Sequence, residues 1–326
     1  MPLPAALSAL DCAEAAARLE GVTRRTPLGG FPAGDQRVEL RVKLECQQVT
    51  GSFKARGAWN QVSQLSAAQR EAGVVTVSSG NHGKALAWAA ARAGVRATIV
   101  MPADAYANKI QACRAEGAEV LLGRDRPHAE ALCRERVEAG ATLVHPYDAE
   151  RTIQGAGTVG LEIAEQWPTV EVALFPVGGG GLIAGSSLAL KRALGERVRV
   201  LGVEPEGART LGLALERGAP VTLEHITTGV QGLCPLALGR LNLEVCRETV
   251  AAALALDDAT ILAAQRELVR EGGWTVEPAG AAAVAAVLAG RLPAELLEGR
   301  GPSDPLRVVA VVSGGNPDPA QLASIR

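Results

Sequence analysis

Residues 172–194 read VALFPVGGGGLIAGSSLALKRAL, and this stretch indicates the fold class. Six mainly apolar residues are followed by four consecutive glycines, Gly178–Gly181, and then by a stretch rich in leucine and alanine. A continuous apolar run is typical of a strand buried on both faces, and a glycine-rich turn into a helix is typical of parallel sheets. The stretch therefore predicts one strand–turn–helix unit of an α/β protein.

The same alternation of short apolar runs and longer helical stretches extends in both directions from this unit. Strands are predicted at Val74–Val77, Ala97–Met101, Glu119–Leu122, Thr142–His145, Val172–Val177, Val198–Val203 and Val308–Val312. Helices are predicted at Lys84–Ala93, Asn108–Glu116, Ala129–Glu138, Gly160–Gln166 and Leu182–Ala193. This pattern indicates an α/β fold with doubly wound, mostly parallel sheets. An earlier run, Arg37–Cys46, alternates apolar and polar residues and predicts a half-exposed strand at a sheet edge.

Length and composition restrict the function classes. The chain has 326 residues, 48% of them hydrophobic and 21% charged, which predicts a globular protein of about two domains. A net charge of −2 and few aromatic residues argue against nucleic acid as a partner. No apolar run is long enough to span a membrane, and the N-terminus does not resemble a signal peptide. Six cysteines without metal-ligand spacing predict reduced core residues of a cytoplasmic protein.

The glycine run is the first candidate binding site. Without side chains, the backbone N–H groups of Gly178–Gly181 can converge on an anion at the start of a helix, where the helix dipole favours negative charge. The alternative is a tight turn, but one glycine is normally sufficient for that. A second glycine pattern, Gly155–Gly160, has the GxGxxG spacing but follows no strand and lacks the later acidic residue of dinucleotide sites. It predicts close helix packing instead.

Lys54 is the second candidate. It lies in the sequence TGSFKARG (residues 50–57), near the start of a predicted helix. The helix dipole and burial both lower a lysine pKa there, which favours the free amine that forms a Schiff base. Only five of the 33 basic residues are lysines, so a retained lysine is informative. The alternative is an ordinary surface lysine.

Two further polar motifs follow predicted strands. The sequence SSGNHG (residues 78–83) offers hydroxyl, amide and backbone donors that suit a carboxylate, although it could be a simple N-cap turn with His82 in solvent. The sequence SGGN (residues 313–316) ends the last apolar strand. Open α/β sheets bind ligands at the carboxyl ends of their strands, so the combination is more specific than either motif.

With these motifs in this order, the chain resembles the fold-type-II pyridoxal-phosphate enzymes, a tryptophan-synthase-β-like fold, in the group of serine/threonine dehydratases and serine racemase. The matching motifs begin at Arg25–Leu28 and continue through Gly51–Gly57, Ser79–Gly83, the glycine run, Val276–Gly280 and Val312–Asn316. Ala55 stands where cysteine synthases and threonine synthases carry aspartate. The resemblance implies a large cofactor-binding domain of residues 1–66 and 147–326, and a small substrate-gating domain of residues 67–146. Composition marks no such boundary.

The resemblance also implies roles for individual residues. Lys54 would hold the cofactor as a Schiff base and then remove the substrate α-proton. The other implied cofactor contacts are Phe53 on the pyridine ring, Asn81 on the ring hydroxyl, Gly178, Gly179, Gly180, Gly181 and Leu182 on the phosphate, and Ser313 at the ring nitrogen. The substrate carboxylate would be received by Ser78, Ser79, Asn81 and His82.

The implied reaction converts L-threonine or L-serine to a 2-oxo acid and ammonia through an aminoacrylate. Ser79 also permits racemisation, because racemases of this group carry a serine there as the second acid/base. Dehydration of 3-hydroxyaspartate and non-catalytic binding of a phosphometabolite are further alternatives; Lys54 argues against the last, because binding alone needs no such amine. Glu204 and Ala208 match two positions of a racemase cation site, but Thr210 replaces its aspartate, so no metal is predicted. The resemblance implies a homodimer.

Overall fold

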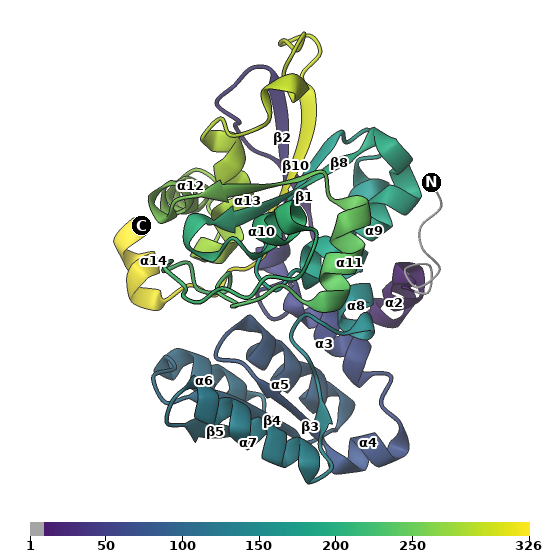
Figure 1. Cartoon of the computed structure of the whole chain (residues 1–326), viewed down its shortest axis with the longest axis vertical. Helices are drawn as coiled ribbons and strands as arrows, with labels where there is room; N and C mark the ends of the chain where they lie inside the picture. The colour runs from purple at the N-terminus through teal and green to yellow at the C-terminus, as the bar shows by residue number, and fades with distance from the viewer. Residues whose placement is uncertain (1–9) are drawn as a thin grey trace.

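A computed structural model describes residues 10–326 and contains two β-sheets, one of six strands and one of four. Figure 1 shows the two sheets in separate parts of the molecule, with α3 (Lys54–Val62) and α8 (Glu150–Gln166) where the parts meet. The smaller part is formed by one continuous stretch of chain, whereas the larger part combines segments from before and after it. The two parts can therefore contribute opposite walls of one site.

The larger sheet has a mostly parallel strand order. Its strands, from one edge to the other, are β1 (Leu28–Gly30), β2 (Val38–Lys43), β10 (Leu306–Val311), β7 (Val172–Pro176), β8 (Arg199–Pro205) and β9 (Ala252–Leu256). Only the pairing of β1 with β2 is antiparallel. The prediction of an edge position for Arg37–Cys46 is wrong, because β2 pairs on both sides. Its alternation reflects Glu39 and Arg41, whose side chains lie half-buried between apolar neighbours.

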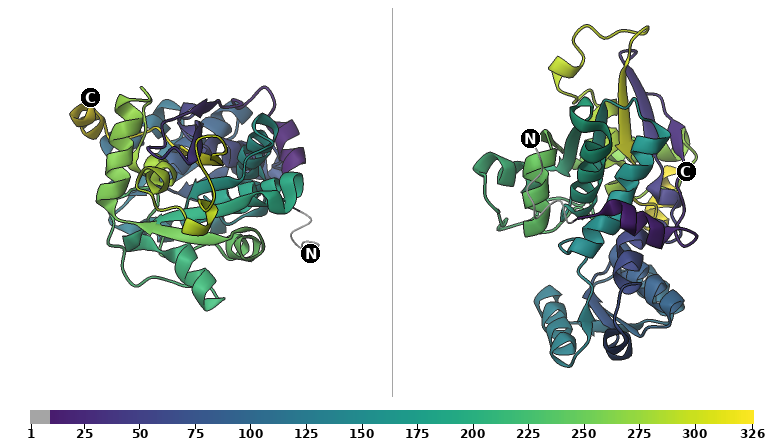
Figure 2. Two further views of the ribbon diagram at one scale, coloured as in Figure 1. Left: turned by 90° about the horizontal axis from the view of Figure 1, so that it is seen from above. Right: turned by 90° about the vertical axis from the view of Figure 1, so that its right-hand side faces the viewer.

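Helices cover both faces of the larger sheet, as a doubly wound fold requires. Successive residues of a strand point to opposite faces, and here Leu174 and Val308 pack in one core cluster while Phe175 and Val309 pack in another. The first cluster includes residues of α12 (Asp258–Arg270) and α13 (Pro278–Leu288), and the second includes residues of α8 and α9 (Gly181–Leu194). Figure 2 shows this layering from two further directions. The other α-helices that the structure describes in this part are α2 (Cys12–Leu19), α10 (Thr210–Arg217), α11 (Arg240–Thr249) and α14 (Pro319–Ile325).

The smaller sheet is entirely parallel. Its order is β5 (Glu119–Gly123), β4 (Ala97–Pro102), β3 (Val74–Val77) and β6 (Thr142–Leu143). The accompanying helices are α4 (Ala67–Ala72), α5 (Asn81–Ala93), α6 (Ala107–Ala115) and α7 (Arg126–Glu138). The SSGNHG motif follows β3 as predicted, but α5 begins at Asn81, inside the motif, rather than near Lys84.

The second glycine pattern lies inside α8, and the prediction of close helix packing is confirmed. A Cβ on Gly155 would lie 2.6 Å from the Arg56 carbonyl oxygen of α3, and one on Gly160 would lie 2.3 Å from the Ser186 carbonyl oxygen of α9. Real Cβ contacts are never this short, so larger residues would push the helices apart. These glycines bring α3 and α9 against the same central helix.

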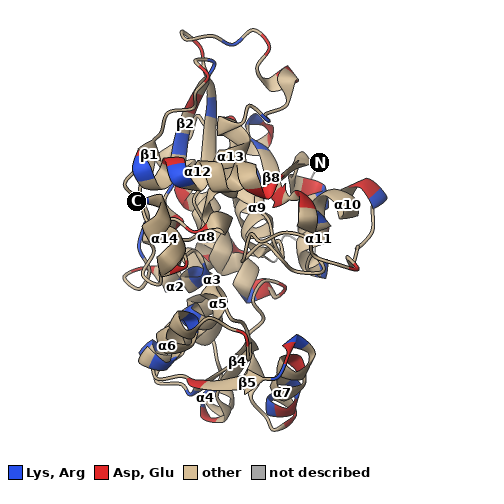
Figure 3. Cartoon of the chain, turned by 90° about the vertical axis from the view of Figure 1, so that its left-hand side faces the viewer, with Lys and Arg blue, Asp and Glu red and all other residues tan. Residues whose placement is uncertain are grey.

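The surface and the cysteines complete the description. On the face shown in Figure 3, acidic and basic positions are interspersed. No helix among residues 10–326 is long and apolar enough to cross a membrane. All six cysteines are free thiols, and all except the half-buried Cys234 are buried.

Candidate active site

Two segments far apart in the sequence pair beside the start of α3. Ser52 forms an antiparallel bridge with Gly314, the Phe53 N–H donates to the Ser313 carbonyl at 3.1 Å, and the Gly315 N–H donates to the Gly51 carbonyl at 2.8 Å. Gly51 has a φ of +77°, which favours glycine. The TGSFKARG and SGGN motifs, predicted separately, are thus one local structure.

Lys54 is the first residue of α3, and its side chain is part-buried. Its Nζ donates to the Pro146 carbonyl at 2.6 Å and lies 5.0 Å from the centroid of the Phe53 ring. Burial lowers the pKa of the Lys54 amine from 10.5 to about 8. The amine is therefore far more often unprotonated near neutral pH than a surface lysine.

The helix that carries Lys54 is held by a buried ionic network. The Arg56 guanidinium donates to Glu45 at 2.7 and 2.8 Å and to Glu162 at 2.6 Å, and the Lys43 Nζ donates to Glu162 at 2.5 Å. Arg56, Glu45 and Lys43 are almost fully buried. Two positive and two negative charges thus balance between α3, α8 and the residues around β2.

The glycine run forms a cradle of bare backbone at the start of α9. A Cβ on Gly179 would lie 2.3 Å from the Tyr147 ring, and a Cβ on Gly181 would lie 2.9 Å from the Tyr147 carbonyl oxygen. Gly180 caps the helix with a φ of +89°. The backbone N–H groups of the first turn of α9 have no partner within the helix, so they suit an anion.

Residues 146–148 connect Lys54 to this cradle. Pro146 accepts the hydrogen bond from Lys54, and the next residue, Tyr147, packs directly on Gly179. Asp148 then accepts from the N–H groups of Arg240 and Leu241, both at 3.0 Å, at the start of α11. The amine and the cradle are therefore contiguous although 124 positions separate Lys54 from Gly178.

Asn81 belongs to a chain of polar contacts between the two parts of the molecule. Its amide group donates to the buried Glu277, and its carbonyl oxygen accepts from Asn316 at 2.8 Å. Burial raises the pKa of Glu277, while Lys109 and the Asn81 amide oppose this shift. Gly314 provides the room, because a Cβ there would lie 2.1 Å from the Glu277 carboxylate.

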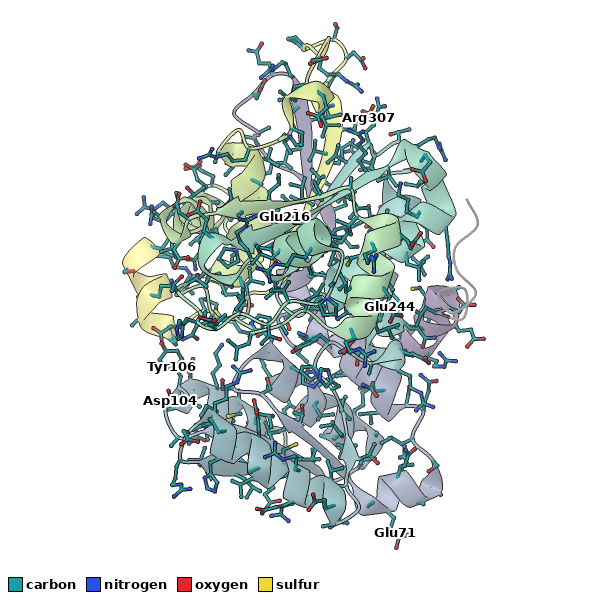
Figure 4. All side chains as sticks on the ribbon, viewed as in Figure 1. Glu71, Asp104, Tyr106, Glu216, Glu244 and Arg307 are labelled. Atoms are coloured by element: carbon teal, nitrogen blue, oxygen red, sulfur yellow. The ribbon has the colours of Figure 1, made fainter. Side chains whose placement is uncertain are left out.

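Two lysines of the smaller part also bind Asn316 of the larger part. The Lys84 Nζ donates to its side chain at 2.9 Å, and the Lys109 Nζ donates to its carbonyl at 2.5 Å. A cavity of about 310 Å³ lies beside these lysines and extends to Gly80 and Asn81. Tyr106, labelled in Figure 4 on the same side of the smaller part, accepts from Gln231 of the larger part at 3.2 Å.

The remaining residues of the SSGNHG motif differ in their surroundings. The Ser78 hydroxyl accepts from the N–H groups of Gly80 and Gly83 at 3.3 and 3.1 Å, whereas the Ser79 side chain is exposed. The His82 ring is buried and lies 3.0 Å from the Val144 carbonyl oxygen. Its Nε2 therefore contacts the backbone of the smaller part. The group that His82 offers to a ligand is its backbone N–H, in the first turn of α5.

Comparisons with known proteins agree with this geometry. Residues 19–314 match the family described as "Pyridoxal-phosphate dependent enzyme". The chain belongs to this family. An L-threonine ammonia-lyase of Thermotoga maritima is 39% identical over 312 residues, which cover 94% of this chain and 75% of the relative.

Two solved structures are similar over nearly the whole chain. A maize serine racemase has a TM-score of 0.87 and 35% identity, covering 96% of this chain and 94% of its own. The processed form of threonine deaminase isoform 2 from Solanum lycopersicum has a TM-score of 0.86 and 30% identity, covering 96% of this chain and 92% of its own. The predicted family, fold class and cofactor are confirmed.

The residues present fit pyridoxal phosphate. The glycine run, where a Cβ would collide with Tyr147 or Leu238, keeps its backbone N–H groups bare for the phosphate, and the part-buried amine of Lys54 suits the aldehyde. Ser313 is buried two residues after the end of β10, and its hydroxyl has a long contact, 3.5 Å, to the Ala279 carbonyl. That hydroxyl therefore remains available to a ligand.

The weak metal candidates have another structural explanation. The Glu204 carboxylate accepts from the Leu211 and Gly212 N–H groups at 2.6 and 2.9 Å and from the Thr210 hydroxyl at 3.3 Å, so it caps α10. Burial raises the pKa of Glu204 to about 7. Among residues 10–326, no group of three or more His, Cys, Asp or Glu side chains could hold a metal ion.

Four residues of this site are not predicted from the sequence. Glu277 and Asn316 lie in the motifs Val276–Gly280 and Val312–Asn316, but nothing local in the sequence shows that they contact Asn81. Tyr147 and Asn242 contact the cradle from separate segments. The resemblance to a family could flag the first two by position, whereas the last two need coordinates.

Proposed function

We propose that this chain is an L-threonine/L-serine ammonia-lyase that releases ammonia and a 2-oxo acid. The observation that carries the proposal is the placement of Lys54, whose lowered pKa and contact with Pro146 bring a reactive amine beside the glycine cradle. The name of the Thermotoga maritima relative, an L-threonine ammonia-lyase, supports the same activity. A binding protein without chemistry would have no need of this amine.

In this proposal each part of the cofactor site has one task. When bound, pyridoxal phosphate supplies an aldehyde and an electron-withdrawing ring that stabilises negative charge at the substrate α-carbon. Lys54 attaches the cofactor and then accepts the α-proton at Nζ. The cradle N–H groups, from Gly178 to Leu182, bind the phosphate, and Phe53 packs on the ring. Asn81 and Ser313 orient the ring through its hydroxyl and its nitrogen.

The substrate carboxylate is assigned to the start of α5. Donors there include the backbone N–H groups of Asn81 and His82 and the hydroxyl of Ser79. Burial, and then the nearby Lys54 charge, lower the pKa of the His82 ring to about 3, so the ring stays neutral at physiological pH. His82 therefore contributes its backbone, and its ring fixes the start of α5 to Val144.

The proposal also covers the domain organisation and the oligomeric state. Residues 67–146 form the small domain that moves over the substrate, residues 1–66 and 147–326 form the cofactor domain, and the protein is a cytoplasmic homodimer. The contacts of Lys84 and Lys109 with Asn316 support this movement. They are hydrogen bonds between the small domain and the cofactor domain, and such bonds can break when the domains separate. Light scattering of the purified protein tests the dimer, and a monomer would contradict it.

Assaying products with both amino acids tests the function. The holoenzyme is expected to form 2-oxobutanoate from L-threonine and pyruvate from L-serine, each with equimolar ammonia. Chiral analysis of the remaining substrate is done on the same samples. D-serine accumulating without pyruvate would replace the proposal with a racemase, and keto acid formed only from 3-hydroxyaspartate would replace the substrate.

Replacing Ser79 by alanine is expected to leave dehydration within about threefold of wild type and to remove any racemisation, because only racemisation needs a second acid at the α-carbon. Ser78→Ala is the matched comparison. Its hydroxyl orders the loop by accepting from Gly80 and Gly83, so its loss is expected to raise KM for both amino acids. A Ser79→Ala enzyme that loses dehydration would show that Ser79 serves the elimination itself.

Cofactor loading is expected to depend on pH through Lys54. Because the pKa of the free amine is lowered to about 8, the fraction of nucleophilic amine rises with pH and levels off above pH 8 rather than above 10.5. The rate at which the apoenzyme gains its visible absorbance is measured between pH 6 and 10 by stopped flow. A rate that keeps rising to pH 10 would contradict this pKa.

A further inference from the structure

The carbonyl oxygen of Gly179, in the middle of the cradle, receives two hydrogen bonds from one direction. The Gly239 N–H donates to it at 3.1 Å, and the Asn242 Nδ2 donates to it at 2.6 Å. The same Nδ2 lies 3.2 Å from the Tyr147 carbonyl oxygen. The Asn242 side chain is fully buried, and it comes from α11, outside all the motifs of the sequence.

These contacts determine the direction of the next N–H group. In a trans peptide the carbonyl and the following N–H point in opposite directions. With its carbonyl held toward α11, the Gly179–Gly180 peptide directs the Gly180 N–H away from α11. Gly180 caps α9, so this N–H belongs to the group of donors at the helix start.

We propose that Asn242 is a positioning residue that orients the Gly179–Gly180 peptide for binding the cofactor phosphate. The proposal rests on the proposed role of the cradle and deepens it. Asn242 acts through the backbone and makes no contact with the reacting atoms.

Two features make Asn242 suited to this task. Both neighbours of its Nδ2 are carbonyl oxygens, so the amide must present its NH₂ group, and its Oδ1 has no hydrogen-bond partner. Asp148 in turn holds the start of α11 by accepting from Arg240 and Leu241. Burying the Asn242 Oδ1 without a hydrogen-bond partner costs stability. The role of Asn242 in orienting the cradle explains why an asparagine stands at this position.

The test compares pyridoxal phosphate with pyridoxal, which lacks the phosphate. Dissociation constants of both are measured by spectral titration of the apoprotein. Asn242→Leu is expected to weaken pyridoxal phosphate binding by about tenfold. The variant loses the hydrogen bond to the Gly179 carbonyl, which orients the Gly180 N–H toward the charged phosphate. Pyridoxal binding is expected to be unchanged, because only the phosphate uses the cradle.

The control is Asn60→Leu. Asn60 is equally buried and donates from its Nδ2 to the Arg151 carbonyl at 2.7 Å, and its Oδ1 accepts from Arg18 and Gln64, so its side-chain hydrogen bonds are not made to the cradle. It is expected to lower the melting temperature of the apoprotein while the ratio of the two dissociation constants stays at the wild-type value. If Asn242→Leu does not fold, Asn242→Ala replaces it.

The outcomes separate the two proposals. Equal weakening of both ligands by the Asn242 variant, or no weakening, would overturn the positioning role while leaving the proposed function intact. A wild-type protein that binds neither ligand would overturn the proposed function itself.

Discussion

Lys54→Ala is expected to abolish the visible absorbance of the holoenzyme and to lower kcat with L-threonine by on the order of 10⁴-fold. The residue carries both the covalent attachment of the cofactor and the proton transfer at the α-carbon in the proposed mechanism. The other four lysines, all within residues 10–326, bind Glu162, Asn316 or Glu196 instead. Absorbance spectra and keto-acid assays on the same preparation measure the two losses together.

Two control experiments test whether the effect is specific to Lys54. Lys191→Ala removes a lysine whose Nζ pairs with Glu196 at 2.7 Å on the surface, and it is expected to retain both absorbance and activity. Borohydride reduction of the wild-type holoenzyme, followed by peptide mapping, is expected to label position 54. Label at another lysine, or substantial activity in Lys54→Ala, would remove the basis of the proposed function.

Arg56→Met is expected to lower the free energy of unfolding by about 3–5 kcal/mol, the usual cost of removing one partner of a buried ion pair. Burial alone would raise the pKa of Glu45, but Arg56 and then Lys43 hold it below its ordinary value. Without Arg56 the buried Glu45 carboxylate and the partly exposed Glu162 carboxylate have only Lys43 to balance them. Urea unfolding of the apoprotein at pH 7 measures the change.

Two comparisons separate buried charge from lost packing. Arg37→Met breaks the exposed pair with Asp35 and is expected to change stability little. Arg56→Met combined with Glu45→Leu leaves the Lys43–Glu162 pair balanced, so it is expected to be more stable than Arg56→Met alone. If the double variant is the less stable of the two, packing rather than charge accounts for the effect.

The stability of the wild type is also expected to depend on pH through Glu45. Its folded pKa lies below the ordinary carboxyl value, so its contribution is present above that value and is lost as the pH falls through the folded pKa. Urea midpoints between pH 3 and 7 measure this loss. The slope below pH 5 is expected to be smaller in the Arg56→Met, Glu45→Leu double variant.

Periodicity predicted most strands correctly because buried parallel strands are continuous apolar runs that are visible locally. β9 was missed because its sequence, AALAL, is mainly alanine and its side chains are only partly buried. The first turns of α8 were also missed, because Gly155 and Gly157 have low helix propensity. Their close contacts with α3 and α9 compensate for that propensity, and such contacts cannot be seen in one segment.

The amino-acid sequence by itself determined the chemistry of this protein: a lysine at a helix start, a glycine run between a strand and a helix, and polar motifs at strand ends. Each of these features is recognised from residues that are adjacent in the sequence. Only the tertiary structure decided that β2 lies inside its sheet, that the His82 ring faces Val144, and that Pro146, Tyr147 and Asn242 join the amine to the cradle. Those relations depend on pairing between distant segments, which local patterns do not encode.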